Sequence, residues 1–101
     1  MNITRIISTW HSGQSWCRIY SDKFCIQGGT VPTASSSNVT VQLHQTYANT
    51  DYVVMLTKFS SYTAISKQYE AAKVNSKAQS SFTISSNSDP YTMYIAFGYI
   101  P

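Results

Sequence analysis

The chain contains short runs in which apolar and polar residues alternate, each bounded by turn-forming residues, and this pattern constrains its fold more than any other feature. In "VTVQL" (39–43), Val and Leu alternate with Thr and Gln, and "SFTIS" (81–85) alternates in the same way. Successive side chains of a strand point to opposite faces, so a period of two indicates strands with one buried face. Both runs are therefore predicted to be half-buried β-strands.

Four other runs are also predicted strands: "WCRIY" (16–20), "FCIQG" (24–28), "YVVMLTKF" (52–59) and "YTMYIAFGYI" (91–100). The first two are separated by the turn-like "SDK" and form a predicted β-hairpin. The run at 52–59 is apolar at consecutive positions, which is typical of a strand covered on both faces. We expect it in the centre of a sheet or at a subunit interface.

Two segments lack a clear strand pattern. The Gly-, Pro- and Ser-rich "GGTVPTASSSN" (28–38) is predicted to be a loop. Residues 60–81 contain good helix formers but no apolar stripe. We expect an irregular strand and loop in that second segment.

The composition favours an all-β fold. The 101 residues include eight Tyr, four Phe and two Trp, and Ser and Thr together supply 27, whereas only 11% are charged. Aromatic and β-branched residues suit a pleated, half-buried surface. We therefore predict one all-β domain, a small β-sandwich of about six to seven antiparallel strands. A domain of this size covers its apolar surface poorly, so oligomerisation is an open alternative.

Charge and hydropathy disfavour several partner classes. The net charge of +3 is modest, and Lys and Arg form no motif of a nucleic-acid-binding protein. No apolar stretch reaches the roughly 18 residues of a membrane span, and the opening "MNITRIISTW" lacks the pattern of a secretion signal. We expect neither nucleic-acid binding nor membrane insertion, whereas an anionic polymer stays a candidate partner.

Cys17 and Cys25 lie on either side of the predicted hairpin turn. If Asp22 and Lys23 form a two-residue loop, the two Cys side chains point to opposite faces. A three-residue loop places them diagonally on one face, with Cβ atoms roughly 7 Å apart against the ~3.8 Å of a disulfide. Both registers predict free thiols.

No residue pattern points to an enzyme. The chain has four acidic residues, Asp22, Asp51, Glu70 and Asp89. Three of them fall in predicted turns, and a glycosidase needs two carboxylates held across one sugar bond. A pair of Cys25 and His44 stays an alternative, although nothing in the sequence marks a lowered thiol pKa. The Cys and His residues also lack the short paired spacings of a zinc motif, so we predict a non-enzymatic protein without a cofactor.

Strand alternation assigns a set of apolar residues to the core or to a subunit interface. They are Trp16, Phe24, Val41, Leu43, Val53, Met55, Phe82, Ile84, Ile95 and Phe97. Two further aromatic residues, Trp10 and Tyr99, are candidates for an interface because a trimer with an apolar axis buries residues that a monomer leaves exposed.

The string "SGQSWCRIYSDKFCIQGG" (12–29) resembles the C-terminal domain of many bacteriophage tail-fibre proteins, in which a Trp, an aromatic-Ser-Asp turn and Gln-Gly-Gly follow in this order. "VTVQLHQTYANTDYVVML" (39–56) and "YIAFGYIP" (94–101) are similar to further parts of that pattern. The matching residues are Trp16, Tyr20, Ser21, Asp22, Gln27, Gly28, Gly29, Asn49, Thr50, Tyr52, Gly98 and Tyr99. Lys23 and Phe24 stand where the family usually has Gly and Trp, so the turn conformation does not transfer.

The resemblance implies a compact, β-rich tip domain at residues 13–101, preceded by the end of a stalk or linker at residues 1–12. It implies a homotrimer, like the fibres that carry such domains, attached to the rest of the tail fibre. It also implies contact with a bacterial surface glycan or protein receptor. Such a protein is made in the host cytoplasm and displayed on the virion.

The candidate receptor-binding residues are polar and aromatic. They are Tyr62, Lys67, Tyr69, Lys73, Lys77, Asn87 and Asp89. Four of the seven basic residues lie between positions 58 and 77 and interleave with Tyr. Sugar faces stack on aromatic rings, and Lys attracts phosphate or carboxylate groups, so acidic glycans would suit this segment. A solvated loop with ordinary Lys residues is the equally simple interpretation.

We therefore predict binding of a host receptor by the distal tip of a phage tail fibre. One alternative is a structural cap that aligns the trimer without touching the host. Another is a small glycan hydrolase, which predicts turnover of purified host polysaccharide.

Overall fold

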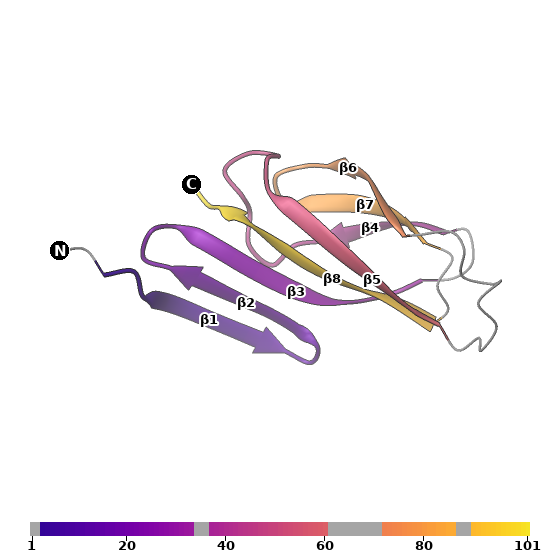
Figure 1. The fold of residues 1–101 in the computed structure, drawn as a ribbon, viewed down its shortest axis with the longest axis horizontal. Coiled ribbons are helices and arrows are strands. Elements are labelled where there is room, and N and C mark those ends of the chain that lie inside the picture. Colours follow the sequence, from indigo (N-terminus) through magenta and orange to yellow (C-terminus); the bar gives the residue numbers. More distant parts are fainter. Residues whose placement is uncertain (1–2, 34–36, 61–71, 87–89) are drawn as a thin grey trace.

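The computed structural model describes residues 3–33, 37–60, 72–86 and 90–101. Within these ranges the chain forms eight β-strands and no helix (Figure 1). They are β1 (Ile6–Ser12), β2 (Ser15–Tyr20), β3 (Phe24–Pro32), β4 (Ser37–Gln42), β5 (Val53–Ser60), β6 (Lys73–Lys77), β7 (Ser81–Ser86) and β8 (Pro90–Tyr99). The prediction of an all-β fold is confirmed for the described part of the chain.

The strands form two antiparallel sheets. The first has five strands in the order β1-β2-β3-β8-β5, and the second has three in the order β4-β7-β6. In Figure 1 the smaller sheet lies beside β5 and β8, and the β1–β2 hairpin lies at the opposite edge of the larger sheet. This two-sheet arrangement agrees with the predicted sandwich. The β1–β2 hairpin lies at the edge of the larger sheet that is farther from the smaller sheet (Figure 1).

The hydrophobic core lies between the two sheets. Its buried residues come from both sheets and from the loop between β4 and β5: Cys17, Cys25, Val41, Leu43, Tyr47, Tyr52, Phe82, Ile84, Tyr94 and Ala96. The rings of Phe82 and Tyr94 meet edge to face across the sheets, with centroids 5.3 Å apart. Tyr47 and Tyr52 stack at 4.4 Å. The Tyr52 hydroxyl donates to the Ala78 carbonyl at 2.7 Å, which satisfies its polar end inside the core.

The turn between β2 and β3 has three residues, 21–23. Ile19 pairs with Cys25, which fixes this register. Lys23 has φ of 72°, in the left-handed region that usually favours Gly, and its N–H donates to the Tyr20 carbonyl at 2.9 Å. This is the three-residue hairpin turn that ends in a left-handed residue. The longer of the two loops considered from the sequence is therefore the one that forms.

Six of the eight strands overlap the predicted runs, and the other two lie outside those runs. One is β1, which lies in the segment that we assigned to the end of a stalk and which pairs with β2 as an edge strand. Most of its residues are exposed on both faces, so no alternation marks it in the sequence. The other is β6, which lies within residues 60–81, where we expected an irregular strand and loop. Its register against β7 shifts between Val74 and Ser76, so the strand part of that expectation agrees with the structure.

The structure differs from two expectations about strand position and length, although the alternative place of β5 at a subunit interface stays a prediction. The apolar run of β5 does not lie in the centre of a sheet, because β5 is the edge strand next to β8. Val54 and Leu56 pack against the core, whereas Val53 and Met55 on the other face are 45% and 60% exposed. In addition, residues 28–32 of the predicted loop continue β3, because they pair with β8.

The ten residues assigned to the core or to an interface fall into three groups. Four lie in the core: Val41, Leu43, Phe82 and Ile84. Three are half-buried: Trp16, Phe24 and Phe97. The other three are exposed: Val53, Met55 and Ile95. For these last three a place in the monomer core is wrong, and a place in a subunit interface stays a prediction.

Candidate functional site

The five-stranded sheet has an outer face that is turned away from the core. Cross-strand pairing places His11, Trp16, Gly28, Ile95 and Met55 in one row across this face. Ile95 and Met55, on β8 and β5, are both substantially exposed. The apolar half of this face thus lies over β8 and β5, and a half that carries His and Arg lies over β1 and β2.

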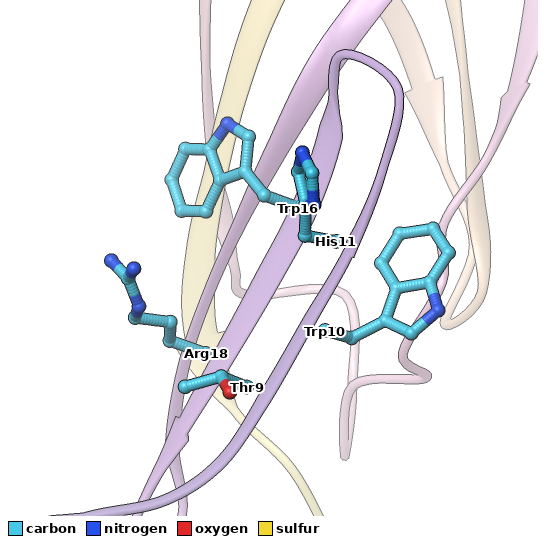
Figure 2. Close-up of a pocket in the computed structure, with 5 residues that line it drawn as sticks. All are labelled: Thr9, Trp10, His11, Trp16 and Arg18. Carbon is cyan, nitrogen blue, oxygen red and sulfur yellow. The ribbon is translucent and has the colours of Figure 1, made fainter.

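A hollow of about 380 Å³ lies on the β1–β2 half, lined by Thr9, Trp10, His11, Trp16 and Arg18. Figure 2 shows the side chains of Trp16, His11 and Arg18 on one side of the hairpin, and the Trp10 indole pointing to the other side. The register explains this arrangement, because His11 pairs with Trp16 and Thr9 pairs with Arg18. We call this hollow the Trp16 site.

The Trp16 indole lies over the backbone of β3, and Gly28 makes this possible. A Cβ at Gly28 would stand 2.7 Å from the Cζ2 atom of Trp16 and 2.9 Å from its Cε2 atom. Real Cβ atoms are not found that close to other carbon atoms, so any other residue at position 28 would displace the indole. The absence of a side chain at Gly28 therefore lets one ring face rest on the sheet.

The Trp16 site is positively charged. The Arg18 side chain is exposed, and within the described ranges it forms no hydrogen bond or ion pair. His11 and Thr9 are also exposed, and none of the described residues that line the hollow is acidic. The Arg18 guanidinium is consequently available to an incoming anion.

The opposite side of the hairpin holds β1 in place. The Trp10 indole stacks on the imidazole of His44, with ring centroids 3.7 Å apart and planes inclined by 10°. His44 follows β4, so this stack connects the edge strand to the smaller sheet. Gly13, in the turn between β1 and β2, has φ of 59°, a conformation that suits Gly. The hairpin that carries the Trp16 site is thus held on its inner side by the Trp10–His44 stack, and Gly13 allows its tight turn.

Most of the receptor-binding residues proposed from the sequence lie outside the described ranges. This applies to Tyr62, Lys67, Tyr69, Asn87 and Asp89. The other two, Lys73 and Lys77, lie on β6 in the smaller sheet. The structure therefore does not bring Lys73 and Lys77 to the Trp16 site.

Lys77 has a structural contact of its own. Its ammonium nitrogen donates to the Tyr52 carbonyl at 2.7 Å and lies 5.3 Å from the centroid of the Tyr52 ring. These contacts tie β6 to the start of β5. The side chain of Lys73 is exposed on the same strand. Of these two candidates, Lys73 is the one whose ammonium contacts no partner within the described ranges.

Sequence reasoning did not identify the Trp16 site. It assigned Trp16 to the core or an interface, weighed His11 only as a zinc ligand and gave Arg18 no role. The only signal in this stretch was a Gly-containing turn between two Trp-bearing segments in "TWHSGQSWCR" (9–18). It was missed because residues 1–12 were not recognised as containing a strand, and without that strand His11 and Thr9 have no fixed neighbours.

The two Cys residues are buried close to each other. Their Sγ atoms lie 3.7 Å apart on the inner face, without a disulfide, so the prediction of free thiols agrees with the structure. Burial raises the pKa of both thiols, that of Cys25 to about 12. A nucleophilic thiol needs a lowered pKa. The raised pKa of Cys25 therefore gives no support to a reactive pair of Cys25 and His44.

Comparison of the chain with protein-family models, with curated proteins and with solved structures finds no match. Among the described residues, no group of three or more His, Cys, Asp or Glu is placed to hold a metal ion. No helix in the same part of the chain is long and apolar enough to cross a membrane. The class that the fold and the site define is an all-β domain with an aromatic, cationic hollow on an open sheet face.

Proposed function

We propose that the chain is a non-enzymatic binding module that attaches to a host surface glycan or protein, as the distal tip domain of a bacteriophage tail fibre. The observation that carries the binding part is the Trp16 indole, which lies over Gly28 on the same side of the hairpin as the exposed Arg18 side chain (Figure 2). The resemblance of residues 13–101 to tail-fibre tip domains supports the place on a fibre. In this proposal the module uses no cofactor, is made in the host cytoplasm and is displayed on the virion.

Binding of a glycan is the physical task that the Trp16 site suits. One face of a sugar ring presents C–H groups that pack on an aromatic ring, while its hydroxyls need fixed polar partners. Trp16 supplies the ring and Thr9, His11 and Arg18 supply the polar groups. A rigid Trp loses little conformational entropy on binding because Gly28 and the sheet already hold it.

Assembly into a homotrimer is part of this proposal, and the apolar half of the outer face supports it. Five exposed apolar side chains share that face: Val53, Met55, Met93, Ile95 and Tyr99. A contiguous exposed apolar patch of a few hundred Å² or more typically marks a contact surface. Burial of this half against further copies would leave the Trp16 site open at the β1–β2 edge.

The binding proposal predicts that Trp16→Ala weakens attachment to host cells about tenfold or more, since loss of ring stacking and apolar contact costs on the order of 1.4 kcal/mol. The measurement is binding of the labelled full chain to a panel of bacterial strains by flow cytometry. Thr40→Ala, at an exposed position of β4, is the matched control and should bind like the wild type. Lys73→Ala tests whether the smaller sheet contributes.

Three outcomes of this experiment are decisive. Loss of binding with Trp16→Ala but not with Thr40→Ala supports the Trp16 site. Equal binding by wild type and Trp16→Ala, with loss in Lys73→Ala, moves the site to the smaller sheet. A wild-type protein that attaches to no strain, or that degrades purified polysaccharide, contradicts the proposed module and favours the cap or the hydrolase.

The second candidate function is a structural cap that aligns the three chains of a fibre, and the apolar half of the outer face favours it. Both fibre functions predict a solution mass three times that of the 11.3 kDa chain. Met55→Lys should lower this mass because it buries a charge in the contact. Thr40→Lys, at the exposed β4 position, should not. Light scattering measures the mass, and a stable wild-type monomer would contradict both fibre functions.

A further inference from the structure

We propose that the Trp16 site takes a sugar ring that carries one anionic group, with the ring on the Trp16 indole and the anionic group on the Arg18 guanidinium. This inference rests on the proposed binding function and narrows it to a ligand class. A carboxylate and a phosphate present the same chemistry to a guanidinium, namely two oxygen acceptors with negative charge.

The strand geometry sets the distance between the two contacts. Trp16 and Arg18 are two residues apart on β2, so their side chains leave the same face about 7 Å apart. Figure 2 shows both side chains extending from the same side of the hairpin. This separation is on the scale of one sugar unit with its exocyclic group. A single ligand residue can therefore reach the indole and the guanidinium together.

The neighbouring strand completes the site with two smaller polar groups. His11 pairs with Trp16 and Thr9 pairs with Arg18, so an imidazole and a hydroxyl stand on the strand next to the one that carries Trp16 and Arg18. Both are hydrogen-bonding partners that suit sugar hydroxyls. The hollow of about 380 Å³ is within the range of small-molecule sites and leaves room for one or two sugar units.

The charge of the site selects an anionic ligand over a neutral one. Within the described ranges, no acidic residue lines the hollow and no ion pair occupies the Arg18 guanidinium. Arg binds carboxylate and phosphate through a planar fork of parallel N–H donors, whereas Lys offers only a point charge. A neutral sugar would use the indole but would leave this fork to water.

The test uses the labelled full chain on an array of immobilised oligosaccharides arranged in matched pairs. One arm pairs uronic-acid oligosaccharides with their carboxyl-reduced counterparts, and the other pairs phosphorylated sugars with their dephosphorylated counterparts. We expect binding to the acidic member of at least one arm to be about tenfold tighter than to its neutral partner. Arg18→Ala should remove that difference, Arg18→Lys should restore part of it, and Thr40→Ala should leave it unchanged.

The outcomes separate this inference from the function on which it rests. Selectivity in the carboxylate arm or in the phosphate arm supports the inference and identifies the anionic group. Equal binding of acidic and neutral members, or selectivity that persists in Arg18→Ala, overturns the inference while glycan binding stands. Attachment to cells without binding to any glycan overturns it as well and points to a protein receptor. Failure to bind both cells and glycans overturns the inference and the proposed function together.

Discussion

Raising the pH from 9 towards 12 is expected to unfold this protein cooperatively. Burial raises the pKa of five groups in the folded chain: Cys17, Cys25, Tyr47, Tyr52 and Tyr94. For Cys25 and Tyr52 the folded pKa is about 12, against ordinary values of 9.0 and 10.0. The core thus contains several groups that ionise at a higher pH in the folded chain than in the unfolded chain.

The sign of the effect follows from proton binding. Above pH 9 an unfolded Cys loses its proton while the folded one keeps it, and Tyr follows above pH 10. The folded state then binds more protons than the unfolded state, so the free energy of unfolding falls as pH rises. Each such group contributes a slope of about 1.4 kcal/mol per pH unit. Several together exhaust the ~5–15 kcal/mol of a typical domain, and their contribution is fully present below pH 9.

Far-ultraviolet circular dichroism and tyrosinate absorbance, followed together against pH, measure this transition. Tyr47→Phe keeps the stacked ring but removes one ionisable group. In this variant the pH slope of the unfolding free energy should be smaller by about 1.4 kcal/mol per unit above pH 10. Tyrosinate formation in a chain that keeps its strand signal up to pH 12, or an unchanged slope in Tyr47→Phe, would show that buried ionisation does not limit stability.

Phe82→Ala is expected to lower the free energy of unfolding by about 3–5 kcal/mol. Phe82 is 1% exposed on β7, and its ring meets Tyr94 of β8 edge to face. The substitution removes apolar burial and leaves a cavity where the two sheets touch. Because the smaller sheet is held largely through this layer, we expect the whole chain to lose stability.

Urea unfolding measures the effect as a lower midpoint with an unchanged denaturant dependence. Thr40→Ala, on β4 with an exposed side chain, is the comparison and should change stability by no more than about 0.5 kcal/mol. A loss below about 1 kcal/mol for Phe82→Ala would mean that the site collapses around the smaller side chain. It would then follow that this contact does not join the sheets energetically.

The alternation of apolar and polar residues was enough to predict the strands that have one buried face. In β7, Phe82 and Ile84 alternate with polar residues, and both enter the core. The β2–β3 hairpin was also predicted, because two aromatic-rich runs enclose a short polar turn. The turn length was left open since Lys23 occupies a left-handed position that sequence rules reserve mainly for Gly.

The tyrosines show where the pattern was incomplete. Tyr47 precedes a turn and Tyr52 follows it, and neither was assigned to the core by alternation, yet both are almost fully buried. Their burial depends on acceptors that come from distant segments. The Tyr47 hydroxyl donates to the Cys25 carbonyl, and the Tyr52 hydroxyl donates to the Ala78 carbonyl. A sequence does not show which carbonyl a buried hydroxyl will reach.

By itself the sequence determined that this chain is built of half-buried strands, because the period of two in its apolar residues is a local property of each segment. The tertiary structure decided which strands are neighbours and which faces stay open. It placed β5 at an edge, added β1 beside β2 and laid Trp16 over Gly28. Those outcomes depend on pairing between residues far apart in the chain, and the Trp16 site exists only because that pairing aligns His11 and Thr9 with Trp16 and Arg18.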